Sequence, residues 1–342
     1  MELGFVLRTA FNAVVPILLL ILLGYFLRRK NFLNDNFLAV GKKLVFNVCL
    51  PVMLFVNIYD IGGFSEIKWD VILYIVAIMF LFFVISLVIA VTSTKVPERR
   101  GVIMQCFYRS NFAIIGLPLA SALGGSEAMA MAAVISAFAI PVFNTFAVIS
   151  LTIFLDNGKS GKIDFKGILL NVAKNPLIIG VISGLAALGI RLLQTELFGE
   201  VVFSIRRDTE FLYKVLNNLK SITSPFALIV LGGQFEFSAV KGMFKEIAVG
   251  TISRLVIAPL IGIGLAVLLT AHTGWISCGV NEYPGMIALF GSPVAVSSAV
   301  MAGAMNNDEQ LATQLVVWTS IGSILTIFLT VCIMMPAGLL AP

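Results

Sequence analysis

Charge is the scarcest feature of this 342-residue sequence. Only 12% of its residues are Asp, Glu, Lys or Arg, and 59% are hydrophobic. Soluble domains carry roughly 25% charged residues. So little charge cannot cover a water-facing surface of this size, which excludes an ordinary soluble protein. The composition indicates a protein whose solvent is the lipid bilayer.

Histidine and cysteine are nearly absent as well. His272 is the single histidine, in a short polar stretch, and the four cysteines are scattered (Cys49, Cys106, Cys278 and Cys332). This spacing predicts neither a disulfide framework nor a metal site. The sequence also lacks a Walker A pattern and any loop large enough for a catalytic domain. We therefore expect no enzyme and no resident cofactor.

Long uncharged runs dominate what is present, for example Val71–Thr94, Ala128–Leu155 and Gln310–Pro342. About 20 apolar residues form a helix that crosses the bilayer, and strand-like alternation is missing. We predict an all-α membrane protein with ten transmembrane helices at residues 10–27, 40–59, 71–93, 101–121, 127–155, 169–190, 218–235, 246–270, 283–304 and 310–335.

The basic residues indicate an orientation rather than nucleic-acid binding. With both termini outside the cytoplasm, 14 Lys and Arg residues fall in cytoplasmic loops and 7 in the opposite loops, five of them in a predicted loop at 191–220. Basic residues concentrate on the cytoplasmic side of membrane proteins. We therefore expect a multi-pass protein of the plasma (inner) membrane with extracytoplasmic termini.

Prolines repeat at matching positions in the two halves of the chain. Pro16, Pro51 and Pro118 in the first half pair with Pro176, Pro225 and Pro293 in the second. Five helices per copy invert the second copy, so the pattern predicts a 5+5 inverted repeat. The repeats would be residues 1–155 and 169–342, joined by a short cytoplasmic linker at 156–168.

Glycine and proline occur together inside the fourth and ninth predicted helices, as Gly116-Leu117-Pro118 and Gly291-Ser292-Pro293. Proline removes a backbone donor, and glycine frees the backbone. We expect each motif to break its helix and to aim the amide-rich end of the second half-helix at the middle of the bilayer, where it could bind an anion. A simple packing kink is the alternative.

The run Arg109-Ser110-Asn111-Phe112-Ala113-Ile114-Ile115-Gly116-Leu117-Pro118 resembles the fourth-helix motif of the auxin efflux carrier family, especially its bacterial members. Pro293-Val294-Ala295-Val296-Ser297-Ser298 is similar to the ninth-helix motif, and the resemblance extends over essentially the whole chain. It implies that broken helices 4 and 9 cross, as in sodium/bile-acid symporters. Helices 1, 2, 6 and 7 would form a scaffold, often dimeric, and helices 3–5 and 8–10 a moving transport domain.

The same resemblance implies a carrier of small organic anions, such as malate or malonate. We expect the substrate to contact Asn111, Gly116, Pro118, Asn144, Gly291, Ser292, Pro293 and Ser297, with Arg109 and Arg254 as candidate charge partners. Asparagine can donate to a carboxylate without the cost of a buried charge, but it also bonds between helices. Arg254 could neutralise the substrate or bind the carbonyls of the broken helices, and we favour the second role.

Other functions remain open at this stage. An anion channel or a sensor that binds an anion without moving it would need the same features. Asp and Glu are confined to polar stretches and helix ends, such as Asp70 and Glu282. Proton and sodium relays commonly use buried carboxylates. Sodium or proton coupling is therefore possible but not indicated.

Overall fold

The computed structural model describes residues 3–60, 68–155, 174–235 and 237–340. Every regular element in these ranges is helical, as the sequence predicts. The elements are α1 (Leu3–Arg29), α2 (Asp35–Leu44), η1 (Val45–Cys49), α3 (Leu50–Tyr59), α4 (Trp69–Ser93), α5 (Pro97–Tyr108), η2 (Phe112–Gly116), α6 (Leu117–Thr152), α8 (Pro176–Phe198), α9 (Ile205–Asp208), α10 (Glu210–Gln234), η3 (Phe237–Gly242), α11 (Phe244–Ile252), η4 (Ser253–Ile257), α12 (Ala258–His272), α13 (Glu282–Gly291), α14 (Ser297–Ala304) and α15 (Glu309–Met334).

Seven helical segments among the described residues are long and apolar enough to cross a bilayer. They are Asp35–Tyr59, Trp69–Ser93, Glu127–Thr152, Pro176–Phe198, Glu210–Gln234, Phe244–His272 and Glu309–Met334. The other predicted spans fall on α1 and on two interrupted helices, α5–η2 and α13–α14. Large apolar side chains such as Leu73, Leu260 and Ile333 are exposed on the outer faces, as lipid contact requires. The predicted linker at 156–168 lies outside the described residues.

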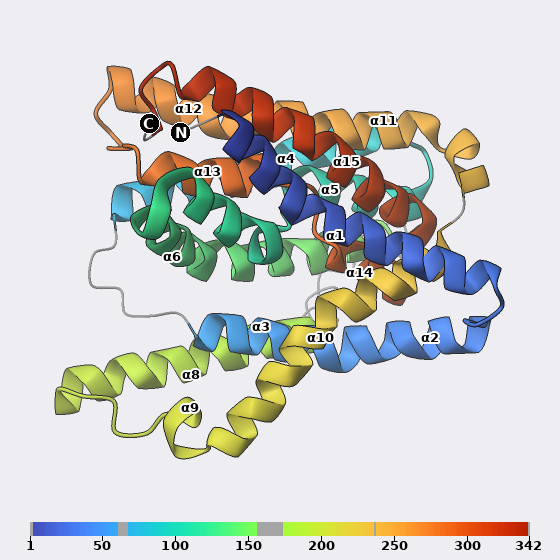
Figure 1. Cartoon of the computed structure of the whole chain (residues 1–342), viewed down its shortest axis with the longest axis horizontal. Coiled ribbons are helices and arrows are strands. Elements are labelled where there is room, and N and C mark those ends of the chain that lie inside the picture. Colours follow the sequence, from blue (N-terminus) through green and yellow to red (C-terminus); the bar gives the residue numbers. More distant parts are fainter. Residues whose placement is uncertain (1–2, 61–67, 156–173, 236, 341–342) are drawn as a thin grey trace.

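The helices form two layers in Figure 1. The lower layer consists of α2, α3, α8, α9 and α10, and the upper layer of α4–α6 and α11–α15. Helix α1 packs against α10 and α15, and so contacts both layers. Glycines allow close packing of these helices: a Cβ on Gly232 of α10 would collide with the Ile21 carbonyl of α1, and one on Gly180 of α8 would lie 2.6 Å from the Pro51 carbonyl oxygen of α3. Small residues serve the same purpose in many membrane helix pairs.

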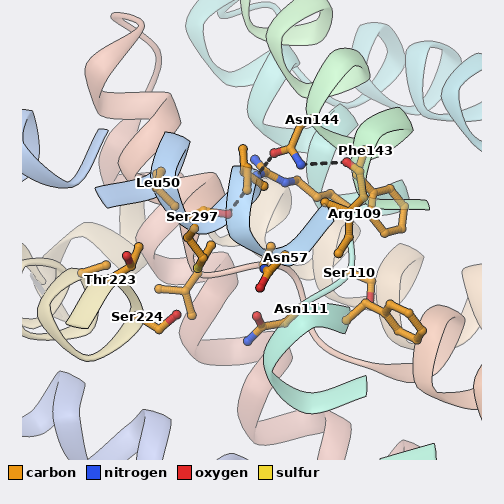
Figure 2. A pocket seen from close by; sticks show the side chains of 17 residues that line it. Leu50, Asn57, Arg109, Ser110, Asn111, Phe143, Asn144, Thr223, Ser224 and Ser297 are labelled. Atoms are coloured by element: carbon orange, nitrogen blue, oxygen red, sulfur yellow. Dashed lines mark hydrogen bonds between the residues drawn. The ribbon is translucent and has the colours of Figure 1, made fainter. Parts of the chain in front are cut away.

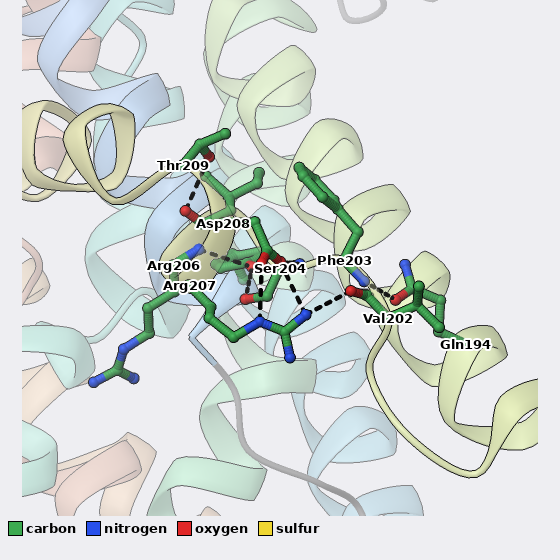
Figure 3. Close-up of polar contacts among 10 residues, drawn as sticks. Gln194, Val202, Phe203, Ser204, Arg206, Arg207, Asp208 and Thr209 are labelled. Carbon is green, nitrogen blue, oxygen red and sulfur yellow. Dashed lines mark hydrogen bonds and ion pairs between the residues drawn. The ribbon is translucent and has the colours of Figure 1, made fainter.

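The prediction of a loop at 191–220 was wrong, because most of these residues are helical. Helix α8 begins at Pro176 and continues to Phe198, and α10 already begins at Glu210. Polar contacts hold the short connection between them (Figure 3). The Ser204 amide donates to Asp208 Oδ2 at 2.7 Å, and the Phe203 amide donates to Gln194 Oε1 at 2.8 Å. Because charged residues follow position 190, the predicted helix at 169–190 ends too early.

Two interrupted helices meet through their extended segments. Helix α13 ends at Gly291 and α14 begins at Ser297, so the predicted break at Gly291-Ser292-Pro293 is confirmed. In the first half, α5 ends at Tyr108 and the helix resumes at Phe112. Ser110 and Val294 form an isolated antiparallel bridge, and the Asn111 amide donates to the Pro293 carbonyl at 2.8 Å.

The predicted break at Gly116-Leu117-Pro118 was therefore wrong in position. The helix runs from η2 directly into α6, with Gly116 in a regular helical conformation. It is interrupted later, at Gly124 and Gly125, where Gly125 has a φ of 70°. That kink matches the predicted gap between residues 121 and 127. Because the true break lies at Arg109–Asn111, Asn111 rather than Pro118 lies opposite Pro293.

Each of the three π-helical turns among the described residues directly precedes a proline in the first turn of the next helix. Segments η1, η2 and η4 end two residues before Pro51, Pro118 and Pro259, respectively. Proline lacks the N–H of a regular helix, and its ring clashes with the carbonyl four residues earlier. A π turn widens the helix at that point. These prolines therefore distort their helices without breaking them.

The extended segments at 109–111 and 292–296, where the two interrupted helices meet, are called the crossing below. Arg254 stabilises the crossing, and its side chain is fully buried. Its guanidinium donates to three backbone carbonyls, those of Phe107 (3.1 Å), Leu289 (2.8 Å) and Ser292 (2.8 Å). These carbonyls lie at the C-terminal ends of α5 and α13, where helices leave acceptors without intrahelical partners. The two C-terminal dipole ends together amount to about −1 charge, which offsets the charge of Arg254.

We predict that Arg254→Met strongly destabilises the folded protein. The substitution leaves three buried carbonyls without donors, at a cost of about 3 kcal/mol or more. Thermal unfolding in detergent should show a large drop in Tm, whereas Arg29→Met, at an exposed position, should leave Tm near the wild-type value. Arg254→Lys should lie between them. Equal Tm values for Arg254→Met and the wild type would contradict a structural role.

Candidate functional site

A cavity lies between the two layers, beside the crossing. Its free space is about 620 Å³, counting the open mouth. Side chains of α3 and α10 form one wall, and the extended segments, α6 and the start of α14 form the other. The polar residues among those that line it are Asn57, Arg109, Ser110, Asn111, Asn144, Thr223, Ser224 and Ser297 (Figure 2).

Arg109 is the cation of this cavity, and its side chain is buried (3% exposed). The extended backbone after Tyr108 directs it toward α6 and α14. Its Nη2 atom donates to Asn144 Oδ1 at 2.8 Å and to Ser297 Oγ at 2.9 Å, and Nη1 donates to Gln105 Oε1 at 3.3 Å. All these acceptors are neutral. No carboxylate of the described residues forms an ion pair with Arg109.

Three consecutive residues at the crossing carry buried polar atoms that have no hydrogen-bond partner in the described part of the chain. They are Arg109 Nε, Ser110 Oγ and Asn111 Nδ2. A buried donor without an acceptor costs about 1–3 kcal/mol. All three atoms belong to residues that line the cavity. The crossing therefore presents an unused set of donors beside a buried positive charge, which is the chemistry needed to bind a carboxylate.

The resumed helices add to the positive potential. Asn111 and Phe112 line the cavity where the first helix resumes, and Val296 and Ser297 line it where α14 begins. Helix N-termini carry a partial positive charge and favour anions. The C-terminal ends of α5 and α13 instead contact Arg254. The crossing thus separates the two helix polarities, with the positive ends at the cavity.

A family model described as "Membrane transport protein" matches residues 9–331, nearly the entire chain. The chain belongs to the auxin efflux carrier family of membrane transport proteins. An uncharacterised transporter of Methanocaldococcus jannaschii is 26% identical to it over 256 residues, which cover 72% of this chain and 76% of the relative. The resemblance inferred from the crossover motifs is therefore confirmed.

The structure brings four of the predicted site residues of this family member to the cavity: Arg109, Asn111, Asn144 and Ser297. Gly116, Gly291, Ser292 and Pro293 are not among the residues that line it. Gly116 packs against the ring of Phe112, while Ser292 and Pro293 supply carbonyls to Arg254 and the Asn111 amide. Pro118 lies in the first turn of α6.

Sequence reasoning missed the polar residues that the lower layer contributes. Asn57 lies on α3, and Thr223 and Ser224 lie on α10. A signal for Asn57 existed, because it is the one amide in the apolar run from Leu50 to Tyr59. Leu50, Met53, Leu54 and Asn57 follow one another at steps of three, one and three residues, so all four lie on one face of α3. The face could be predicted, but the partner it faces could not.

We predict that Arg109→Met changes the stability of the ligand-free protein little. The substitution loses hydrogen bonds to Asn144 and Ser297, but it also removes a buried charge without a counter-ion, which offsets the loss. Tm in detergent should stay within about 3 °C of the wild type. A drop as large as that of Arg254→Met would show that Arg109 supports the fold rather than the cavity.

Proposed function

We propose that this protein is a secondary transporter of small organic anions, of the mono- or dicarboxylate class that includes malate and malonate. The observation that carries the proposal is the buried Arg109, without a carboxylate partner, beside unpartnered donors of Ser110 and Asn111 in one cavity. Membership of a transporter family supports movement of the bound anion.

The electrostatics of the cavity favour an anion over a neutral solute. A buried guanidinium costs several kcal/mol of desolvation free energy that neutral hydrogen-bond acceptors offset in part. A carboxylate would compensate the charge, and it could accept from Arg109 Nε and Asn111 Nδ2, for which the described residues offer no acceptor. Asn144 and Ser297 would hold the guanidinium in place, because both bind its Nη2 atom.

The position of the cavity favours alternating access of the elevator type. Its walls come from different layers, so a substrate there touches both. In this proposal α1, α2, α3, α8 and α10 form the scaffold, and the upper layer forms the transport domain that carries the crossing. The ten-helix inverted repeat belongs to the same proposal, with its fourth and ninth helices interrupted at residues 109–111 and 292–296.

Polar contacts join the layers at one end of the molecule. Lys42 of α2 forms an ion pair with Glu309 of α15 at 2.7 Å, and Gln310 Nε2 donates to the Gln234 carbonyl of α10 at 2.7 Å. Lys42 is one of the 14 basic residues that the predicted orientation places on the cytoplasmic side. We infer that these contacts close the cytoplasmic side in the observed state. The plasma membrane location, the extracytoplasmic termini and a scaffold-mediated homodimer are parts of the same proposal.

Uptake into proteoliposomes tests the function. The wild type should accumulate labelled malate or malonate, and Asn111→Ala should lower uptake at least about tenfold, because the variant loses a donor to the carboxylate. Asn47→Ala is a matched control, since Asn47 is exposed and bonded to the Lys43 carbonyl. Wild-type uptake by Asn111→Ala would contradict the site. Binding without accumulation would favour a sensor, and single-channel currents would favour a channel.

Cross-linking tests the movement of the layers. In a variant with its natural cysteines replaced, Lys42→Cys and Glu309→Cys can be joined by a bifunctional reagent that forms reducible disulfides. The bridged protein should still be stabilised by malate or malonate in a thermal-shift assay but should not transport them, because the layers are held in one arrangement. Reduction should restore uptake, and each single-cysteine variant should be unaffected by the reagent. Full transport by the bridged protein would contradict alternating access by layer movement.

A further inference from the structure

Two polar side chains on the lower-layer wall have no hydrogen-bond partner among the described residues. Asn57 of α3 and Ser224 of α10 both line the cavity, and both are half-buried. Neither side chain makes a hydrogen bond to another described residue. Thr223, their neighbour, differs because its Oγ1 atom donates to the carbonyls of Cys49 (3.1 Å) and Leu219 (2.6 Å).

The side chains that share a face of α3 with Asn57 are apolar and offer its amide no hydrogen-bond partner. Leu50, Met53 and Leu54 share its face of α3, and Ala227 lines the cavity from α10. A fully buried amide without a hydrogen bond costs about 1–3 kcal/mol on the protein scale, and the half-buried Asn57 amide bears part of this cost. A leucine at this position would avoid that cost. The amide is therefore explained best by a partner that enters the cavity.

The two walls of the cavity offer different chemistry. The upper wall has the buried Arg109 charge and the Asn111 amide, which suit an ionised carboxylate. The lower wall has no charged residue among those that line the cavity, and offers the Asn57 amide and the Ser224 hydroxyl. An amide and a hydroxyl can each donate and accept, so they suit a second polar group of the same ligand. Figure 2 shows Thr223 and Ser224 on the side opposite Arg109 and Ser110, with Asn57 between them.

We propose that Asn57, supported by Ser224, binds the second polar head of a two-headed anion whose first carboxylate lies at the crossing. This assignment rests on the proposed function and names the residue that selects among its substrates. Asn57 then determines the preference for a dicarboxylate over a monocarboxylate of similar size. Arg109 and Asn111 determine affinity for both, since both ligands carry the first carboxylate.

Succinate and butyrate test the assignment, because a carboxylate in one takes the place of a methyl group in the other. Thermal-shift titrations of purified protein give the affinity for each anion. The wild type should bind succinate at least about tenfold more tightly than butyrate, since a hydrogen bond to a charged group is worth about 1.5–3 kcal/mol. Asn57→Leu should bring the ratio close to one, chiefly by weakening succinate. Ser224→Ala should reduce the ratio less.

Asn47→Leu is the matched control, with the same substitution on the same membrane span at an exposed position outside the cavity. It should keep the wild-type ratio. Equal binding of both anions by the wild type, or an unchanged ratio in Asn57→Leu, would overturn the assignment while leaving the carboxylate site intact. Loss of binding of both anions by Asn57→Leu in equal proportion would also overturn it. Absence of any anion binding by the wild type would instead overturn the proposed function, and this assignment with it.

Discussion

Two helix interruptions buried inside a membrane protein leave backbone groups that must find partners within the chain, because lipid offers none. On the acceptor side, Arg254 supplies three hydrogen bonds to carbonyls at the ends of α5 and α13. The bridge between Ser110 and Val294 joins the extended segments themselves. The geometry of the cavity depends on these contacts, because they fix the backbone from which Arg109 and Asn111 project.

This arrangement gives the two buried arginines opposite tasks. Arg254 faces the negative C-terminal ends of two half-helices, which neutralise its charge, so this charge stabilises the fold. Arg109 lies at the positive ends, where its acceptors Gln105, Asn144 and Ser297 are neutral, and no carboxylate of the described residues compensates its charge. A cation at a helix C-terminus is stabilising, whereas one near an N-terminus is not. The free-energy cost of burying the Arg109 charge near these N-terminal ends is explained by the proposed anion, which would occupy the cavity during transport.

The helical class and the membrane environment could be predicted from composition and long apolar runs, and the family from the resemblance of the motifs at Arg109–Pro118 and Pro293–Ser298. The break after α13 could be predicted too, since Gly291 and Pro293 frame it. The break at Arg109–Asn111 could not. No residue there disfavours a helix strongly, and the extended conformation depends on pairing with Val294, far away in the sequence. Pro118 misled the prediction because a π turn before it accommodates the missing N–H.

For the lower-layer wall, the sequence marks Asn57 as a single amide in an apolar run, but it does not indicate what this helix face lies opposite. The role proposed for Asn57 depends on the upper layer, which places Arg109 and Asn111 in the same cavity. A carrier whose layers move must release any contact that joins them through the substrate. A neutral amide suits that need, since its net hydrogen bond is worth about 0.5–1.5 kcal/mol to an uncharged group and about 1.5–3 kcal/mol to a charged one, while breaking a buried ion pair costs about 3–5 kcal/mol. In the proposed elevator movement, selectivity from Asn57 and affinity from Arg109 would be divided between the layers, with the weaker contact on the lower layer.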